Sequence, residues 1–403
     1  MEILLKNKWI TSTILLVLVA TSWLLLFQVR QPDYAVFLLP WLSDIRASDG
    51  LTVFSTGFTN YTGGYVAILW LAERIDFFSD GALGDLAVIK IAAIFGSVMC
   101  SAGVWSVLRA LDWTQVDAFI AAISALLLPE VLLNGAAWAQ ADALYAAFLT
   151  FTIAAMIRAK PYIAVTCFAV AVSIKLQAIW LAPLMAGWLL GRPRMIIPAI
   201  IAVPMAYVTV NSLYLIAGRP FREVMLIYFS QFETFERLSM NAPNLWLFAD
   251  RMLQPDWLTA QFSALVAVGM IAAFVMALWI VWKVYRLPQN AGSQLIYWAA
   301  ISTISMPFLL PKMHERFFFS AGIFAYLLAV IDRRYVMAAM LIQFAALMSY
   351  AQYHDTVGIA ALFGRTTSIL LAFVCMAAAF AKLLQLREPR VGSSPDTESS
   401  NQL

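Results

Sequence analysis

Long apolar runs, separated by short polar connections, limit the folds open to this chain more than any other feature. The first run covers residues 9–29, and further runs follow at about 86–111, 118–134, 141–157, 162–174, 178–190, 195–217, 258–282, 296–310, 317–331, 335–350 and 366–384. A helix of roughly 20 apolar residues crosses the hydrocarbon core of a bilayer. Because 63% of the residues are hydrophobic and 12% are charged, the soluble multidomain class is excluded. We predict an all-α polytopic membrane protein with about 12 transmembrane helices.

Two soft boundaries give this count a range of about 10 to 13 helices. Residues 64–75 could form a further short span, and the region around Lys175 could be one long helix or two short ones. In every case residues 1–388 form one integral-membrane domain. Residues 389–403 are polar, rich in Pro and Ser and free of aromatics, so we expect a disordered cytoplasmic tail.

Basic residues flank the apolar runs in a regular order. Lys6 and Lys8 precede the first run, which ends without a small-residue cleavage site and therefore predicts a retained signal anchor. Counting from a cytoplasmic amino terminus, every predicted inner turn carries a basic residue: Arg109, then Arg158 and Lys160, Arg192 and Arg194, Lys283 and Arg286, and Arg333 and Arg334. This pattern predicts a multi-pass protein of the cell inner membrane with both ends inside. The two long loops, about 30–85 and 218–257, then face the periplasm, together with the short connection 311–316.

Several function classes are excluded by what the sequence lacks. The net charge is only +3 and the basic residues are scattered, which argues against nucleic acid as a partner. Lipid kinases and nucleotide-sugar enzymes fit poorly, because the sequence contains no Gly-rich phosphate loop and no soluble stretch long enough to hold a nucleotide. The pair His314-Glu315 lacks the second histidine of a zinc-protease helix, because position 318 is Phe318.

Ionisable residues at the hydrocarbon level cost roughly 2.5–3.5 kcal/mol each, so each requires a partner, water or a function. Asp33 lies where the first run meets water and is our leading catalytic residue, although an aspartate there could also cap a surface helix. Lys175 interrupts an apolar run and is either a cation of the site or a side chain that extends to the interface. Lys90 and Glu130 lie inside runs, where an intramembrane pair or packing contacts would explain them.

A cationic cluster lies in the short outer connection before an aromatic triplet. Lys312, His314 and Arg316 could hold a phosphate group by charge-assisted hydrogen bonds, or could form an ordinary solvated turn at the membrane surface. The predicted topology places this cluster on the same side as Asp33. A base beside a phosphate-binding cluster suits glycosyl transfer from a lipid phosphate, because the base takes a proton from the acceptor hydroxyl while the cations stabilise the leaving group.

We therefore predict an inverting hexosyltransferase that takes its sugar from a polyprenyl-phosphate donor at the periplasmic face. The acceptor is a hydroxyl of a lipid-linked or cell-surface glycan, and mannose is one candidate for the hexose. The rival is a transporter or flippase of a polyprenyl-linked sugar, which would use the same cations without a catalytic acid. No cofactor is predicted; no motif requires a divalent metal, although Asp33 and Asp142 could share one. The oligomeric state is left open.

Six short motifs carry a resemblance to a known family. They are Asp33-Tyr34 with Pro40-Trp41, Asn60-Tyr61 with Tyr65, Trp138-x-Gln140-x-Asp142, Lys175-Leu176-Gln177 with Pro183, Asn241-Ala242-Pro243-Asn244-Leu245-Trp246, and Pro311-Lys312-Met313-His314-Glu315-Arg316-Phe317. Over about residues 9–320 the chain resembles integral-membrane glycosyltransferases of the GT-C superfamily, and most closely the bacterial family related to the GPI-anchor mannosyltransferases. The resemblance implies a catalytic base at Asp33, amphipathic helices in the first outer loop and a lipid monophosphate-linked sugar as donor.

The same motifs supply the remaining site residues. To donor phosphate we assign Lys312, His314, Arg316 and Lys175, and to substrate binding Tyr34, Asn60, Tyr61, Gln140, Asp142, Gln177, Asn241, Asn244 and Glu315. For some of these a structural role competes: Asp142 could cap the fourth span, the two asparagines could form a simple turn, and Glu315 could only orient its neighbours. The chain departs from the family pattern at Ala139, where glycine is usual, and at Gly63-Gly64, where a proline is usual.

Overall fold

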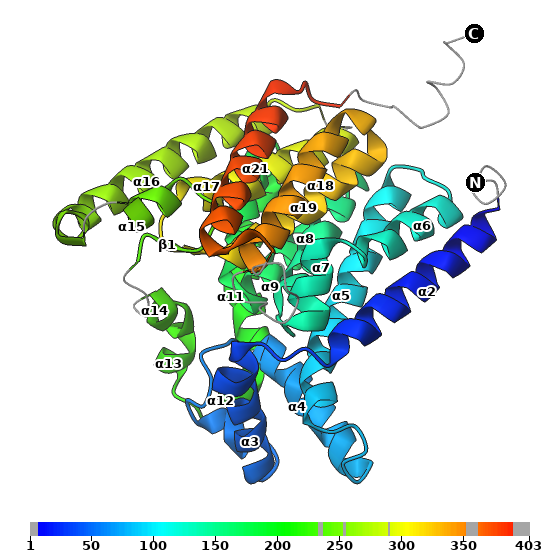
Figure 1. Cartoon of the computed structure of the whole chain (residues 1–403), viewed down its shortest axis with the longest axis vertical. Helices are drawn as coiled ribbons and strands as arrows, with labels where there is room; N and C mark the ends of the chain where they lie inside the picture. The colour runs from blue at the N-terminus through cyan, green and yellow to red at the C-terminus, as the bar shows by residue number, and fades with distance from the viewer. Residues whose placement is uncertain (1–6, 233–236, 253–254, 289–290, 352–361, 390–403) are drawn as a thin grey trace.

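The computed structural model describes residues 7–232, 237–252, 255–288, 291–351 and 362–389, and its regular structure is almost entirely helical (Figure 1). The first half of the chain forms α2 (Lys8–Phe27), η1 (Tyr34–Leu38), α3 (Leu39–Ala47), η2 (Thr52–Ser55), α4 (Gly63–Phe78), α5 (Asp85–Ala110), α6 (Gln115–Ala125), α7 (Pro129–Val131), η3 (Leu132–Ala137), α8 (Asp142–Ile157), α9 (Pro161–Ile174), η4 (Leu176–Leu181) and α10 (Ala182–Leu190). The second half forms η5 (Pro193–Met195), α11 (Ile196–Val210), α12 (Ser212–Ile216), α13 (Phe221–Met225), α14 (Ile227–Phe232), α15 (Trp246–Met252), α16 (Pro255–Tyr285), α17 (Gly292–Leu309), η6 (Glu315–Phe318), α18 (Phe319–Ile331), η7 (Arg333–Tyr335), α19 (Val336–Tyr350) and α21 (Arg365–Gln385). Two short strands, β1 (Ser239–Met240) and β2 (Met313–His314), pair in parallel.

The all-α class is confirmed, and each predicted apolar run coincides with a helix or with two consecutive helices. In the described part of the chain, five helices are long and apolar enough to cross a membrane: Lys8–Phe27, Asp85–Ala110, Pro193–Val210, Ala260–Tyr285 and Arg365–Gln385. The remaining runs form helices that are shorter or, as in the 18-residue α17, less apolar. For example, α18 has 13 residues and extends about 20 Å, against the roughly 30 Å of a hydrocarbon core. The figure of about 12 spans stays a prediction, and residues 64–75 form α4 within the first loop.

Two runs are broken where the sequence predicts continuous or ambiguous helix. The run at 118–134 bends by 55° between Gln115–Ala125 and Pro129–Ala137, because Pro129 cannot continue the preceding helix and begins a new one. The run around Lys175 is also interrupted, since Lys175 has extended backbone angles between α9 and η4. Broken helices inside a bundle let polar side chains enter its interior, and both breaks lead directly into segments that carry motif residues.

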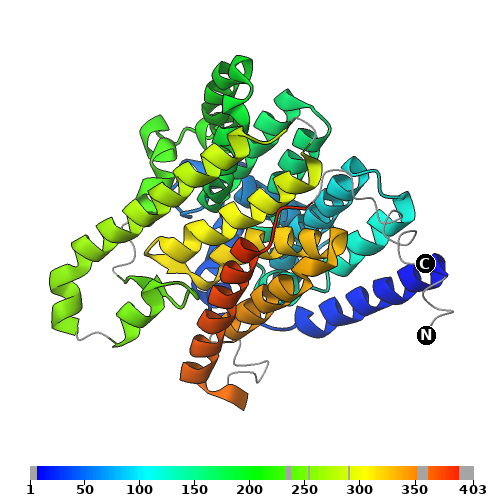
Figure 2. The same ribbon diagram turned by 90° about the horizontal axis from the view of Figure 1, so that it is seen from above.

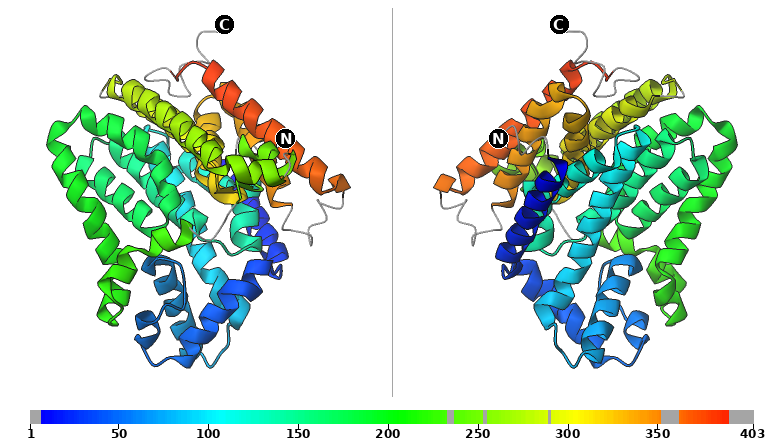
Figure 3. Two further views of the ribbon diagram at one scale, coloured as in Figure 1. Left: turned by 90° about the vertical axis from the view of Figure 1, so that its left-hand side faces the viewer. Right: turned by 90° about the vertical axis from the view of Figure 1, so that its right-hand side faces the viewer.

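The packing gathers the predicted inner turns at one end of the molecule. The start of α2 meets the start of α6 through the ion pair of Lys8 with Asp117 at 2.8 Å, and Arg158 after α8 donates to the Ser106 hydroxyl near the end of α5 at 2.9 Å. In Figure 1 the start of α2 and the end of α21 lie toward the top, whereas α3 and α4 lie at the bottom. The views in Figure 3 agree. The first loop and the predicted inner turns therefore occupy opposite ends of the molecule.

The centre of the bundle is α8, which packs against α5 and α9. The contact with α5 depends on glycine: a Cβ at Gly103 would lie 1.9 Å from the Thr150 hydroxyl, and one at Gly96 would lie 3.0 Å from the Leu144 backbone nitrogen. Small residues of this kind allow helices to approach closely in membranes. Two of the long apolar helices, α2 and α16, lie at the periphery, since their apolar windows are only 6% and 17% buried, and Figure 2 shows both at the edges of the bundle.

The first predicted outer loop is folded into η1, α3, η2 and α4, as the resemblance implies for helices in this loop. The glycines that replace the family's proline lie where α4 begins. The Gly63 backbone N–H donates to the Asn211 side-chain oxygen at 2.8 Å, and a Cβ on Gly63 would lie 2.7 Å from the Val210 carbonyl oxygen. A residue without a side chain is therefore required for α4 to approach α11.

An ion network joins α3 to α4 and α5. The Arg46 guanidinium lies 2.5 Å from Asp85, 3.1 Å from Asp76 and 3.9 Å from Glu73. The side chains of Asp76 and Glu73 are only 4% exposed, and a second Asp76 oxygen accepts from the backbone N–H groups of residues 83 and 84. Arg46 therefore pairs with Asp76, shares Glu73 with Arg74, whose Nε lies 2.7 Å from the Glu73 carboxylate, and fixes the first loop on the bundle.

Replacing Arg46 with glutamine is expected to lower the free energy of unfolding by about 2 kcal/mol, because it leaves two buried carboxylates with less compensation. Since the Arg46 side chain is 36% exposed, water screens part of the loss. Thermal unfolding of the purified protein in detergent measures the effect. Arg222→Gln, an exposed position on α13, is the control and should leave the midpoint unchanged. Equal midpoints for both variants would contradict the role of the network.

Of the remaining predicted segments, the loop at 218–257 contains α13, α14, β1 and α15 in its described parts. The predicted tail lies outside the described residues from residue 390 onward.

Candidate functional site

Asp33 lies just after α2, and two side chains of one distant segment hold it. Its Oδ2 atom accepts hydrogen bonds from Trp138 Nε1 at 3.0 Å and Gln140 Nε2 at 2.7 Å. The side chain makes no capping hydrogen bond to the helical turn that follows, so the structure does not support the alternative role as a helix cap. Its Oδ1 atom accepts no hydrogen bond from any residue that the structure describes, and the side chain is 25% exposed. One carboxylate oxygen is thus fixed and the other is available.

The turn that holds Asp33 contains a residue in an unfavourable conformation. Ala139, between Trp138 and Gln140, has a φ of +61°. This left-handed region favours glycine, because a Cβ there approaches the backbone too closely. A glycine, which is usual at this position in the family that the chain resembles, would adopt the same turn without this strain.

Lys90 joins the two segments that form this arrangement. It is 2% exposed, and its Nζ lies within hydrogen-bond distance of four backbone carbonyl oxygens, those of Leu26, Phe27, Val29 and Ala136, at 3.1, 2.5, 2.9 and 2.6 Å, which share its three N–H donors. Leu26 and Phe27 end α2, Val29 lies two residues beyond it, and Ala136 lies two residues before Trp138. Lys90 therefore holds the segment before Asp33 against the segment that binds Asp33. It is not paired with Glu130, whose carboxylate accepts from Gln343 instead.

Arg316, in η6, approaches Asp33 from a segment nearly three hundred residues away in the sequence. Its Nη1 lies 3.8 Å from Asp33 Oδ2 and 3.4 Å from Glu315 Oε1, and the guanidinium carbon lies 5.4 Å from the Trp138 ring centroid. The Arg316 Nε is buried and has no hydrogen-bond partner among the described residues. A guanidinium has five N–H donors, so Arg316 keeps donors for a further anionic group.

Glu315 is only 2% exposed and binds the cations on both sides of it in the chain. Its carboxylate lies 3.8 Å from His314 Nδ1 and 3.4 Å from Arg316. Burial raises the pKa of Glu315, but the neighbouring His314 and Arg316 side chains outweigh burial and keep that pKa below its usual value. The geometry agrees with the orienting role considered for Glu315 rather than with direct contact to a ligand.

Lys175 and Asp142 form a buried ion pair. Lys175 Nζ lies 2.6 Å from Asp142 Oδ1, and Asn134 donates to Asp142 Oδ2 at 2.9 Å. Asp142 is fully buried and makes no side-chain cap to α8. The Lys175 ammonium also lies 5.7 Å from the ring centroid of Tyr61, whose hydroxyl donates to Gln140 Oε1 at 3.3 Å. Asp142 thus orients Lys175 and has both oxygens occupied.

The second long loop supports the strand that carries the cations. β1 pairs with β2 in the register Ser239 to Met313 and Met240 to His314, and Asn241 forms a bridge to His314. Asn244 is fully buried and donates to the carbonyls of Pro307 and Leu310, at 3.3 and 3.1 Å. The two asparagines therefore hold the second long loop against β2 and the adjoining residues 312–316, which we call the cation strand.

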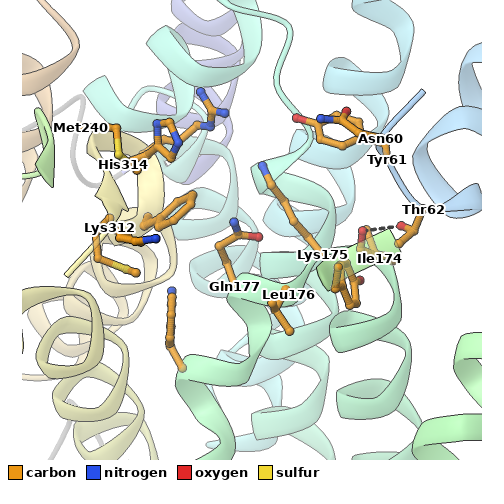
Figure 4. A pocket seen from close by; sticks show the side chains of 15 residues that line it. Asn60, Tyr61, Thr62, Ile174, Lys175, Leu176, Gln177, Met240, Lys312 and His314 are labelled. Atoms are coloured by element: carbon orange, nitrogen blue, oxygen red, sulfur yellow. Dashed lines mark hydrogen bonds between the residues drawn. The ribbon is translucent and has the colours of Figure 1, made fainter. Parts of the chain in front are cut away.

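A cavity of about 990 Å³, its solvent-open part included, lies between the cation strand and the broken helix at Lys175 (Figure 4). Of the predicted site residues it is lined by Asn60, Tyr61, Lys175, Gln177, Lys312, His314 and Arg316. Tyr34, Gln140, Asp142, Asn241, Asn244 and Glu315 do not line it, and Tyr34 is buried beneath the Arg30 guanidinium at 5.3 Å. Asp33 also lies outside the lining and contacts the cavity through Arg316.

Sequence reasoning missed several lining residues: Thr62, Ile174, Leu176, Trp180, Tyr228, Met240, Met313 and Phe317. Most are apolar and resemble the many core residues of this chain. Leu176, Met313 and Phe317 lie inside the motifs quoted above, and Trp180 follows Gln177 by three residues, so these four carried a usable signal.

Comparison with known proteins does not identify a family. A scan against models of protein families finds no match to this chain, and a search of curated protein sequences finds no relative. The resemblance therefore rests on the six motifs alone. In the structure each motif contacts another. The contacting pairs are Asp33 with Gln140, Tyr61 with Gln140, Asp142 with Lys175, Asp33 with Arg316, and Asn241 with His314.

Proposed function

We propose that this protein is an integral-membrane glycosyltransferase of the GT-C type. It moves a hexose, such as mannose, from a polyprenyl-phosphate donor to a hydroxyl of a lipid-linked or cell-surface glycan acceptor. The proposal includes about 12 spans, a location in the cell inner membrane and a site open to the periplasm. One observation carries it: residues of five motifs, spread over nearly three hundred residues, meet at one carboxylate and one cation-lined cavity, and the motif at 241–246 supports the strand that contains His314.

The reaction is a direct displacement. The available oxygen of Asp33 takes the proton of the acceptor hydroxyl, and the hydroxyl oxygen forms a bond to the anomeric carbon of the hexose. The bond between this carbon and the phosphate oxygen breaks, and the phosphate retains the electron pair. Trp138 and Gln140 hold Asp33 by its other oxygen, so the base is oriented before the acceptor arrives.

The departing phosphate needs positive charge at the cavity wall. Lys312 just before β2, His314 in β2 and Arg316 in η6 supply this charge, and Arg316 has further N–H donors for the phosphate. Lys175 also lines the cavity, but Asp142 already neutralises its charge. We therefore assign the phosphate chiefly to the three cations of the strand and turn, with Lys175 as a hydrogen-bond donor at the opposite wall.

Reconstitution tests this function against its rival. Purified protein is placed in proteoliposomes with a polyprenyl phosphate that carries a radiolabelled hexose, together with a crude acceptor lipid extract. We expect the label to appear in the acceptor lipids while sugar-free polyprenyl phosphate accumulates in equal amount. Movement of the intact labelled donor across the bilayer without loss of its sugar would instead indicate the transporter or flippase.

A further inference from the structure

The η4 turn presents two polar side chains to the cavity from one face. Gln177 and Trp180 both line the cavity and stand three residues apart in this 3₁₀ turn. Side chains at positions i and i+3 of a 3₁₀ helix lie directly above one another. The turn itself is fixed, because the Ser302 hydroxyl donates to the Trp180 carbonyl at 2.5 Å and Lys175 at its start is held by Asp142.

Both side chains contain a buried polar atom that the fold does not use. Gln177 Oε1, an acceptor, and Trp180 Nε1, a donor, have no hydrogen-bond partner among the described residues. Buried polar groups of folded proteins are nearly always satisfied, so an exception at a cavity wall points to a bound group. Here an acceptor and a donor are left over side by side.

A sugar ring matches this pair chemically. Each hydroxyl of a hexose both donates and accepts, and an indole offers an apolar surface together with one N–H donor. In the view of Figure 4 the Gln177 side chain lies between those of Lys312 and Lys175. A hexose attached to a phosphate at Lys312 would therefore extend toward Gln177. Resting on the proposed function, we propose that Gln177 and Trp180 form the subsite for the hexose ring of the donor.

If Gln177 and Trp180 bind the hexose ring, changing them should weaken recognition of the sugar and leave recognition of the phosphate intact. Gln177→Met keeps the length of the side chain and removes the amide acceptor. Trp180→Phe keeps an aromatic, although smaller, apolar surface and removes the N–H donor. Matched controls are Gln294→Met and Trp188→Phe, which remove equally unpartnered buried polar atoms at positions outside the described lining of the cavity.

The test measures how tightly each variant in nanodiscs binds two probes, polyprenyl-phosphate hexose and bare polyprenyl phosphate. Each variant is first shown to unfold at the same thermal midpoint as the wild type. The wild type should prefer the glycosylated lipid, and either subsite variant should lose about tenfold of that preference while binding the bare lipid as before. Both controls should keep the preference.

A preference unchanged in both subsite variants would overturn the subsite, and so would equal losses for both lipids. A wild type that binds both lipids equally would overturn it as well. A wild type that binds the glycosylated lipid but transfers no sugar would instead contradict the proposed function, because the sugar subsite would then serve a carrier.

Discussion

Replacing Asp33 with asparagine is expected to lower the rate of hexose transfer by about 10²- to 10⁴-fold, the usual contribution of a positioned general base. The amide has the same shape, and its oxygen can still accept hydrogen bonds from Trp138 and Gln140. It cannot take a proton from the acceptor. Binding of the polyprenyl-phosphate donor should therefore be preserved while transfer is lost.

The matched control for this variant is Asp44→Asn, which removes an exposed carboxylate from α3 in the same loop. It should transfer hexose at the wild-type rate. Transfer and donor binding are measured on the same proteoliposome preparation. Near-wild-type transfer by Asp33→Asn would show that the base has been assigned wrongly, whereas parallel loss of transfer and binding would indicate a role in holding the substrate.

Arg316→Gln is expected to reduce kcat/KM for the donor by about 10²- to 10³-fold, comparable to removing one preorganised donor from a developing negative charge. The guanidinium lies at the cavity wall, and it also approaches Asp33 and Glu315. Arg316→Lys should restore only part of the loss, because an ammonium lacks the planar fork that binds phosphate in a bidentate manner.

Steady-state kinetics with the reconstituted protein measure both Arg316 variants. Arg334→Gln is the control, since the Arg334 guanidinium is bound to Asp332 at 2.5 Å in the turn after α18, away from the lining of the cavity. A wild-type kcat/KM in Arg316→Gln would remove this residue from the phosphate site. Arg316→Gln leaves the buried Glu315 with only His314 beside it, which could destabilise the fold. The thermal midpoint of the variant shows whether a lower kcat/KM comes from unfolding or from weaker binding.

The helices could be predicted from the sequence because apolar runs of this length have few alternatives to helical structure in a membrane. The breaks could not be located in the same way. Pro129 and Lys175 lie within otherwise apolar sequence, and hydropathy alone does not distinguish a kink from a continuous helix. In the structure the helix axis bends by 55° before Pro129, and Lys175 is an extended residue between α9 and η4.

The site could be predicted in outline but not in its pairings. The order of runs and basic turns was enough to expect Asp33 and Arg316 on one side, and they lie 3.8 Å apart. The partners of Lys90 and Lys175 depend on tertiary contacts. Lys90 binds carbonyls more than forty residues away, and because every residue has a backbone carbonyl, the sequence does not indicate which ones it binds. For the same reason Asn244 looked like a ligand-binding residue, although it holds two carbonyls at the end of α17.

The central claim is that Asp33 activates the acceptor hydroxyl for a single direct displacement at the anomeric carbon. The most direct test is the configuration of the new glycosidic bond, determined by NMR of the product formed by the reconstituted wild type from a donor of known configuration. A single displacement predicts complete inversion at the anomeric carbon. Retention would contradict the account, because it requires a nucleophile of the protein and a covalent intermediate in place of a base.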